Sequence, residues 1–272
     1  MIRYFFIIIL FYSSDAYPEL NINEELRNVP GGILAAEITE SEHAMTWSFN
    51  KKNILSVKNN NRYYLLYGLK HGHLDGNHDI TFTSGKFSKN ISYHVKKKNF
   101  LKQFINISKK YTAPNNDELK RIRKEGKLFA PYRTKKVNKQ PDIDFIYPVN
   151  GIITGQFGTR RFYNGEEGRM HNGLDIASKD SLDIIAPSSG TVIFVGDFFY
   201  NGKFAYIGHG KGLKSIFLHM SEVSVKIGQS VKKGQIIGKI GNTGKSAGAH
   251  LHWSLILNDT YIDPMVFLKN DL

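Results

Sequence analysis

The chain has 272 residues, a length that suits two domains of roughly 100 to 150 residues better than one small module. Its hydrophobic fraction of 41%, with 18 Phe and 14 Tyr, excludes a wholly disordered or collagen-like chain, and its lack of cysteine excludes disulfide scaffolds, thiol catalysis and cysteine-ligated zinc. The formal net charge of +13 favours anionic surroundings, such as nucleic acid, acidic lipid or a carboxylate-rich cell-wall polymer, without choosing among them.

The first residues have the pattern of a cleaved secretory signal. Arg3 precedes an apolar and aromatic run over residues 4–12, and small residues follow at Ser14 and Ala16. The run is too short to span a bilayer, and no other apolar run of about 18 residues occurs, so we expect no stable membrane span. We predict a signal peptide over residues 1–16 and an exported mature chain that starts near Tyr17. A buried N-terminal strand and an uncleaved anchor are the alternatives.

The next part of the chain is rich in short runs of β-branched and aromatic residues, separated by turn residues. These runs cover residues 33–38, 45–49, 63–67, 80–83 and 91–95. Their length and composition predict strands, so we expect an all-β N-terminal domain over residues 17–112. The lysines at 96–98 and around 51–58 fit a solvated basic face, with a polyanion-binding surface as the alternative.

A helix start is predicted at residues 115–118, where Asn115 can act as N-cap and acidic residues occupy the first turn. Apolar residues follow at helical spacing, and we expect this short helix to end at Gly126. Residues 127–144 are polar and basic, as in a connector. The sequence therefore predicts a helix and basic linker over residues 113–144.

Glycines become frequent after residue 145 and recur between short apolar runs. This spacing is typical of tight antiparallel β-structure with many turns. We therefore place a C-terminal antiparallel β-sheet domain over residues 145–272. The expected fold class is mainly β, with the two β-domains joined by a short helical connector.

Two histidine motifs could bring metal ligands together. His250 and His252 alternate along one predicted strand, so both side chains would project from the same face. His171 and Asp175 stand four residues apart on a second segment, with Gly173 between them. Either motif alone is common by coincidence or as a satisfied polar pair, but the two together indicate a divalent metal site. Two histidines and one aspartate leave a coordination position for water, as in catalytic zinc sites.

His219 follows an apolar run and could face the same cleft as a base or proton donor. An ordinary edge-strand position is the alternative for this residue. Its sequence context alone does not separate the two.

The order of motifs after residue 145 is distinctive. The segments are PVNG (148–151), GQFGTRR (155–161), HNGLDIA (171–177), APSSGTV (186–192), LHMS (218–221), VKKGQIIG (231–238), GNTG (241–244) and GAHLHW (248–253). In this unbroken order they resemble the lysostaphin- and LytM-type zinc metallopeptidases of bacterial cell walls. The chain departs from the family pattern in the turn at 178–183 and at Phe217, where tyrosine is common, so a hydroxyl contact to substrate is lost there.

The resemblance implies an antiparallel β-sheet with an open groove in which His171, Asp175 and His252 hold one zinc ion per chain. His219 and His250 fall on the family's catalytic histidines. They would activate the zinc-bound water or stabilise the tetrahedral intermediate, and the sequence does not divide these two tasks. A further histidine at a position that the family often fills, His209, is interpreted as structural.

The resemblance also implies hydrolysis of peptide cross-links in peptidoglycan, whose peptide stems would be the partner. The fusion to an N-terminal β-domain is similar to Gram-negative periplasmic enzymes that cut D-alanyl-diaminopimelate bonds, so we expect a location in the periplasm or cell wall. In such relatives the N-terminal domain or its linker partly covers the groove, which suggests intramolecular inhibition here.

Two other functions remain as alternatives. A catalytically inactive wall-binding regulator of other hydrolases is similar in fold, but such members have typically lost metal ligands that are present in this chain. Nucleic-acid binding fits the basic charge, but it is disfavoured by the export signal and by the lack of aromatic and basic recognition motifs.

Overall fold

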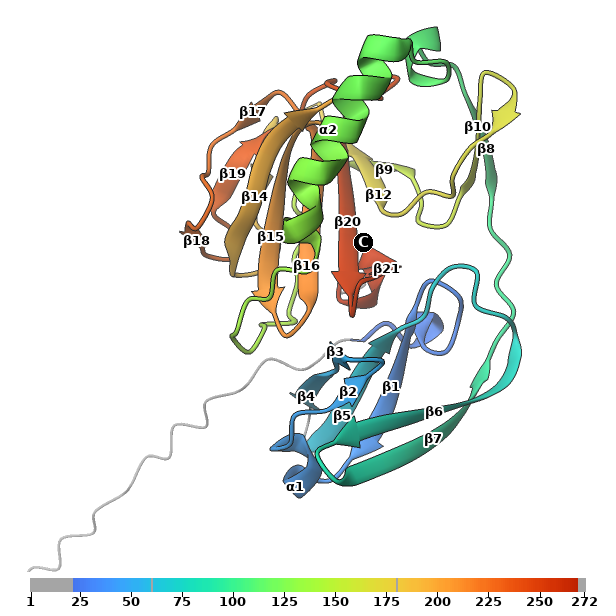
Figure 1. Ribbon diagram of the computed structural model, residues 1–272, viewed down its shortest axis with the longest axis vertical. Coiled ribbons are helices and arrows are strands. Elements are labelled where there is room, and N and C mark those ends of the chain that lie inside the picture. The colour runs from blue at the N-terminus through green and yellow to red at the C-terminus, as the bar shows by residue number, and fades with distance from the viewer. Residues whose placement is uncertain (1–21, 60, 180, 269–272) are drawn as a thin grey trace, which may run out of the picture.

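The computed structural model describes residues 22–59, 61–179 and 181–268, coloured along the chain in Figure 1. The expected signal peptide lies outside the described residues, as do residues 17–21 of the expected N-terminal domain. Strands dominate the described chain, so the prediction of a mainly β fold is confirmed. No helix within the described ranges combines the length and apolar character needed to cross a membrane.

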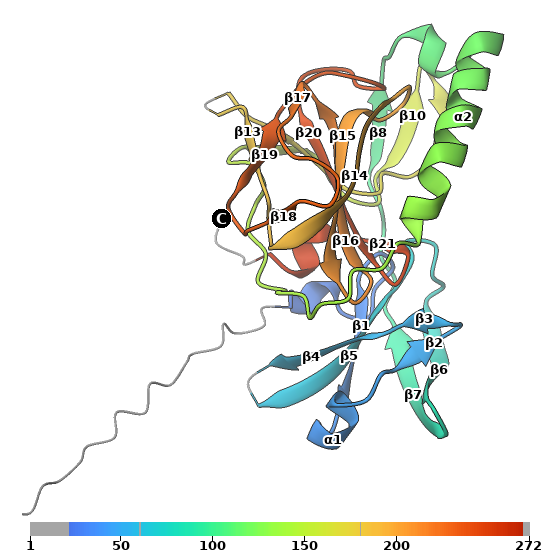
Figure 2. The ribbon, with the colours of Figure 1, turned by 60° about the vertical axis from the view of Figure 1, so that its left-hand side comes forward.

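Two small antiparallel sheets pack against each other in the N-terminal half (Figure 2). The first has the order β1-β5-β4, from β1 (Ile33–Ile38), β4 (Leu55–Asn59) and β5 (Arg62–Gly68). The second has the order β3-β2-β6-β7, from β2 (Ser48–Phe49), β3 (Lys52–Asn53), β6 (Gly76–Ser84) and β7 (Phe87–Val95). Two short helical turns, η1 (Glu24–Leu26) and α1 (Glu40–His43), flank β1.

The strand predictions in this half are partly confirmed. β1 has the predicted bounds, but the run at 45–49 contributes only β2, because Trp47 turns into the core and its indole N–H donates to the Glu42 carbonyl at 2.8 Å. β4 was not predicted. Its Leu55 and Val57 are buried and alternate with polar residues, within a stretch that the sequence suggested was a solvated basic face.

The predicted helix start is confirmed, whereas the predicted end at Gly126 is wrong. Helix α2 runs over Asn116–Arg133, and Asn115 caps it in a reciprocal capping box with Glu118. A side chain at Gly126 would meet open space, so this glycine imposes no break. The second half of α2 forms because Phe129 and Tyr132 pack onto the aromatic face of the C-terminal sheet, which outweighs the low helix propensity of Gly126 and Pro131.

An eight-stranded antiparallel sheet forms the frame of the C-terminal half. Its order is β18-β14-β15-β16-β20-β12-β9, with β21 also paired to β20. Its strands are β9 (Ile152–Gly155), β12 (Leu174–Ala177), β14 (Gly190–Phe198), β15 (Gly202–Gly210), β16 (Leu213–Met220), β18 (Ser230–Val231), β20 (Leu251–Leu257) and β21 (Thr260–Ile262). Helix α2 lies across β14 and β15 (Figure 1).

Two three-stranded sheets complete this half. One, with the order β13-β19-β17, contains β13 (Asp183–Ile185), β17 (Glu222–Val223) and β19 (Ile236–Lys239). The other, with the order β11-β10-β8, joins β10 (Arg160–Tyr163) and β11 (Glu166–Glu167) to β8 (Lys102–Ile105), a strand of the connecting segment. Short turns η2 (Lys109–Tyr111) and η3 (Pro264–Val266) follow β8 and β21.

The two halves share one apolar core. A single buried cluster contains Leu55 and Leu66 of the first N-terminal sheet together with Trp253 and Leu255 of β20. Backbone hydrogen bonds cross the same boundary, for example from the Asp263 N–H to the Gly31 carbonyl at 2.7 Å. The N-terminal sheet therefore supports the strand that carries the candidate site.

Candidate metal centre

Asp175 and His252 are placed side by side by the pairing of β12 with β20. They are direct partners in the antiparallel register, so their side chains leave the same face of the sheet. His171 lies just before β12, and its backbone N–H and carbonyl are held by Thr159 and Gly158. Three side chains from two distant segments thus meet at one end of the sheet.

Three donor atoms converge at this point. His171 Nε2 lies 3.0 Å from Asp175 Oδ1 and 2.9 Å from His252 Nδ1, and His252 Nδ1 lies 2.8 Å from the same carboxylate oxygen. All three residues are buried, and their ligand atoms lie within 4.8 Å of one another. The structure therefore brings together the residues predicted as metal ligands.

The remaining ring nitrogens have their own partners. His171 Nδ1 donates to the Gln156 carbonyl at 2.8 Å, so its Nε2 carries the lone pair. His252 Nε2 lies 2.8 Å from the Ser254 hydroxyl, which can accept its N–H and leave the Nδ1 lone pair inward. With these tautomers, two nitrogen lone pairs and a carboxylate oxygen face one another without a proton between them, and a cation resolves that repulsion. The donor set fits Zn²⁺, and the outward hydrogen bonds resemble those that orient metal-bound histidines.

The charge states of the cluster support the same interpretation. Burial lowers the pKa of His252 to about 4, although the neighbouring Asp175 acts in the opposite direction. Burial by itself would raise the pKa of Asp175, but hydrogen bonds from His171 and His252, which form when a proton rather than a metal ion lies between the rings and the carboxylate, outweigh this and hold it well below its usual value. At neutral pH the cluster therefore holds a carboxylate beside a neutral imidazole, which is the state that a divalent cation needs.

The second oxygen of Asp175 accepts a hydrogen bond from the guanidinium of Arg161 on β10, and the pair is buried. Gly155 makes room for this contact, because a Cβ there would lie 2.6 Å from the Arg161 nitrogen and 2.7 Å from the Asp175 oxygen. The two carboxylate oxygens thus have separate partners, with Oδ1 facing the imidazoles.

His219 and His250 lie next to the three donors, as the sequence predicted for a shared cleft. Their ring centroids are 5.1 Å apart, and His219 is 6.1 Å from the His252 ring. His250 Nε2 lies 3.6 Å from Asp175 Oδ1. In both rings Nδ1 donates to a backbone carbonyl at 2.8 Å, that of Thr243 for His219 and that of Gly248 for His250, so Nε2 is the nitrogen left to accept a proton.

His219 reaches this position through an unusual backbone conformation. Its φ of 64° is left-handed, at the irregular end of β16. Gly241 allows the neighbouring chain to approach, because a Cβ there would lie 2.7 Å from the His219 carbonyl oxygen. Left-handed backbone at a non-glycine residue costs of order 1 kcal/mol, and such conformations cluster at functional sites. The alternative of an ordinary edge-strand residue is therefore not what the structure shows.

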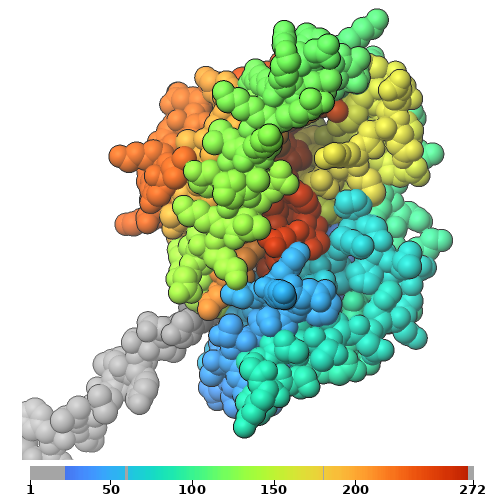
Figure 3. All heavy atoms as spheres, viewed as in Figure 1, coloured from blue at the N-terminus to red at the C-terminus, as the bar shows by residue number. Residues whose placement is uncertain are grey.

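The site borders the β10–β11 segment, because Arg161 of β10 binds Asp175. In Figure 3 the surface is hollowed between the green helix α2 and the yellow β10–β11 segment, with red atoms of the C-terminal strands below. Lys245 packs on β10, where its Nζ lies 3.5 Å from the centre of the Tyr163 ring. Burial lowers the pKa of Lys245, and the nearby Arg161 and Arg169 act in the same direction. Three cationic side chains thus lie near one another beside β10, and one of them, Arg161, is paired with Asp175.

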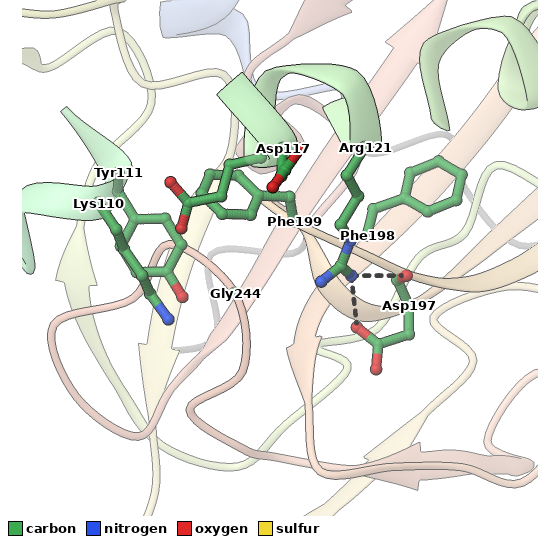
Figure 4. Close-up of a pocket in the computed structure, with 9 residues that line it drawn as sticks. Lys110, Tyr111, Asp117, Arg121, Asp197, Phe198, Phe199 and Gly244 are labelled. Carbon is green, nitrogen blue, oxygen red and sulfur yellow. Dashed lines mark hydrogen bonds and ion pairs between the residues drawn. The ribbon is translucent and has the colours of Figure 1, made fainter. Parts of the chain in front are cut away.

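Figure 4 shows a pocket between η2, the start of α2 and the β14–β15 turn. Arg121 there binds the Asp197 carbonyl at 3.3 Å. Gly244 also lines it, one residue from Thr243, which holds His219. The connecting segment and the loop that positions a predicted catalytic histidine therefore line the same pocket.

Sequence reasoning missed the residues that support the five predicted ones. Arg161 was noted only as part of a motif, and Gln156, Thr243 and Ser254 were assigned no role. Their contributions depend on backbone carbonyls and on strand pairing, which no local spacing encodes. His209, interpreted as structural, is fully buried, and its ring nitrogens lie within hydrogen-bond distance of Ser189 and Ser215.

Comparison with known proteins agrees with this geometry. The family model described as peptidase family M23 matches residues 169–264. The chain carries an M23 peptidase domain. The predicted resemblance to the lysostaphin and LytM type is thereby confirmed, and this M23 domain contains all five predicted site residues but not Arg161.

Similar proteins extend the match beyond the M23 domain. Peptidoglycan DD-endopeptidase ShyC of Vibrio cholerae is 26% identical over 255 residues, which cover 91% of this chain and 52% of ShyC. Lysostaphin of Staphylococcus simulans is 37% identical over 112 residues, 39% of this chain and 23% of lysostaphin. A crystal structure of an M23 peptidase from Pseudomonas aeruginosa has a TM-score of 0.71 and 28% identity, and covers 89% of this chain and 95% of that one. The chain thus spans about half or less of the curated relatives named here.

Proposed function

We propose that the chain is an exported zinc endopeptidase that hydrolyses peptide cross-links of peptidoglycan at the D-alanyl-diaminopimelate bond. The observation that carries the proposal is the convergence of His171 Nε2, Asp175 Oδ1 and His252 Nδ1 at one buried point. The names of similar proteins, among them ShyC, support peptidoglycan as the substrate. One Zn²⁺ per chain would be held by these three residues.

The metal ion and the side chains contribute different parts of the hydrolysis. When bound, Zn²⁺ supplies a water of lowered pKa and polarises the scissile carbonyl. His219 and His250 each present a free Nε2 beside the donor cluster, so they can take a proton from the attacking water or donate a hydrogen bond to the developing oxyanion. Burial, reinforced by His252 and His250, lowers the pKa of His219 to about 3, so this residue is neutral at pH 7.

The edge of the hollow suits an acidic peptide. Lys245 Nζ has no carboxylate partner among the residues that the structure describes, and Arg169 adds positive charge nearby, whereas the charge of Arg161 is paired with Asp175. Peptide stems of peptidoglycan carry free carboxylates, which such a cluster attracts. The overall charge of +13 favours the same polymer.

The alternative function is that of a wall-binding regulator without catalysis. A regulator needs neither a complete donor set nor free imidazoles beside it, and this chain has both. The ring centroid of His219 lies 5.1 Å from that of His250 and 6.1 Å from that of the donor His252, and this proximity favours the enzyme.

Purified sacculi provide the test. The chain starting at Tyr17 is expected to bind about one zinc ion and to release cross-linked muropeptides as monomers, whose masses identify the cleaved bond. A His252→Ala protein is expected to lose both zinc and activity. Digestion at an undiminished rate by that variant would contradict the proposal.

We also propose that the segment between β8 and α2 restricts access to the hollow. Asn164, beside β10, exchanges two hydrogen bonds of 3.0 Å with the backbone of Ile107, and Tyr111 packs on Phe199 of the β14–β15 turn at 5.2 Å between ring centroids. The segment therefore contacts both the β10–β11 segment and the β14–β15 turn. Replacing Asn164 by Ala should raise the rate of sacculus digestion severalfold if this strap is inhibitory, and an unchanged rate would mean that it is not.

A further inference from the structure

A strand from outside the M23 domain borders the candidate site. β8 pairs with β10 in parallel, and Gln103 is the direct register partner of Arg161. β8 belongs to the segment that leads from the N-terminal sheets to α2, and it adds a third strand to β10 and β11 (Figure 1). The connection between these two parallel strands contains α2, and the pairing brings one polar side chain to the edge of the metal centre.

Gln103 uses both ends of its carboxamide. Its oxygen accepts the Arg161 Nε–H at 3.1 Å, and its nitrogen donates to the Thr154 carbonyl of β9 at 3.5 Å. The Thr154 hydroxyl in turn donates to the backbone carbonyl of Asp175 at 3.4 Å. Gln103 thus connects β10 and β9, the two strands that flank the Asp175 carboxylate.

The Arg161 guanidinium is fixed at two points. Nη2 binds Asp175 Oδ2, and Nε binds Gln103, while the side chain is only 10% exposed. Because a guanidinium is planar, two separated contacts determine the orientation of the whole group. The contact with Asp175 then leaves only Oδ1 for the imidazoles of His171 and His252.

We propose that Gln103 is a positioning residue for the metal site: its carboxamide oxygen orients Arg161, and Arg161 holds the Asp175 carboxylate with one oxygen toward the metal. This inference rests on the proposed function in that it takes the three donors as metal ligands. It adds that the M23 domain does not fix the metal ligand Asp175 by itself, because Gln103 of the connecting segment completes the hydrogen bonds that hold the carboxylate through Arg161.

Loss of the carboxamide oxygen has a definite physical consequence. The Arg161 Nε–H would remain buried without an acceptor, which is costly, so the guanidinium would move to find another partner. The carboxylate could then rotate and offer both oxygens to the imidazoles. Replacing a residue that supports a metal ligand typically changes metal affinity or activity by about 10- to 100-fold.

Three single variants of the full mature chain test the proposal. Gln103→Met keeps the length of the side chain but removes the acceptor, and Gln103→Glu restores an acceptor oxygen at the same place. Lys102→Met is the matched control, because it introduces the same side chain on the opposite, exposed face of β8. Zinc affinity is measured by competition with a chromophoric chelator, which requires no peptide hydrolysis.

We expect Gln103→Met to bind zinc about tenfold more weakly than the unchanged chain, and Gln103→Glu and Lys102→Met to stay within about threefold. Equal affinity of Gln103→Met and the unchanged chain would overturn the inference, as would equal weakening by Lys102→Met. Sacculus digestion is assayed separately. Normal zinc binding without digestion would refute the proposed function and leave the role of Gln103 to be decided by the affinities.

Discussion

Nε2 of His171 and Nδ1 of His252 lie 2.9 Å apart, although 81 positions separate the two residues in the sequence. His171 Nδ1 is committed to the Gln156 carbonyl, so Nε2 has no proton to donate to its neighbour. With His252 in the tautomer that leaves its Nδ1 lone pair inward, a positive charge between the rings makes the contact favourable, and Asp175 Oδ1 supplies the third side of the same site.

Removal of the metal should therefore destabilise the protein. At a zinc concentration 100-fold above its Kd, binding to the folded state contributes about 2.7 kcal/mol. We expect a chelator to lower the Tm, followed by calorimetry, by roughly 5 to 10 °C, and added zinc to restore it. A His171→Ala protein should not respond to the chelator. A Tm of the unchanged chain that is the same with and without chelator would show that the three donors do not bind a metal.

Replacement of His219 should separate catalysis from metal binding. Its Nδ1 binds the Thr243 carbonyl and its ring lies 6.1 Å from that of His252, so it contacts the site without belonging to the donor set. We expect His219→Ala to lower kcat/KM at least about 100-fold, since a positioned acid or base typically contributes that much. Zinc content by elemental analysis should remain near one per chain. Loss of zinc from this variant would instead make His219 a ligand.

Lys245 should contribute to substrate binding through its charge. We expect Lys245→Met to raise KM by roughly three- to tenfold and to leave kcat nearly unchanged, with a smaller difference from the unchanged chain at high salt. Lys226→Met, an exposed lysine elsewhere on the domain, serves as the control. Equal KM values for the two variants would remove Lys245 from the substrate site.

The fully buried His209 should make stability depend on pH. Burial lowers the pKa of His209 to about 4, while the Ser189 carbonyl acts in the opposite direction. As pH falls below about 6.5 the unfolded chain takes up the proton first, so stability present at neutral pH is lost progressively down to about pH 4. Between pH 7.5 and pH 5 this one group accounts for about 2 kcal/mol of lost stability.

Urea unfolding of the zinc-saturated protein at these two pH values measures that loss. His209→Gln is expected to be less stable at pH 7.5 but to lose about 2 kcal/mol less than the unchanged chain on acidification. The same loss in both proteins would mean that His209 is not the titrating group.

Much of the metal centre was predictable because its residues come in local motifs. The alternation of His250 and His252 on one strand and the spacing of His171 and Asp175 are short-range properties of extended backbone. β12 carries Asp175 and β20 carries His252, while His171 and His250 lie shortly before these two strands. The mainly β fold followed equally from local composition, as did the start of α2, where Asn115 and Glu118 form the capping box.

The wrong helix end at Gly126 and the missed strand β4 share a single cause. α2 continues past Gly126 because Phe129 and Tyr132 pack onto strands more than 60 residues further along the chain. β4 forms because Leu55 and Val57 enter a core shared with β20. In both places long-range burial of apolar surface outweighed local propensity, and local propensity is all that a short window of sequence reports.

The sequence by itself determined which side chains could chelate a metal and on which strands they would stand. Only the tertiary structure decided which nitrogen of each imidazole faces inward, that His219 adopts a left-handed backbone, and that Gln103 and Arg161 surround Asp175. The reason is physical: ligand identity is a property of residue type and local period, whereas orientation depends on hydrogen bonds to carbonyls and strands that are distant in the chain and adjacent only after folding.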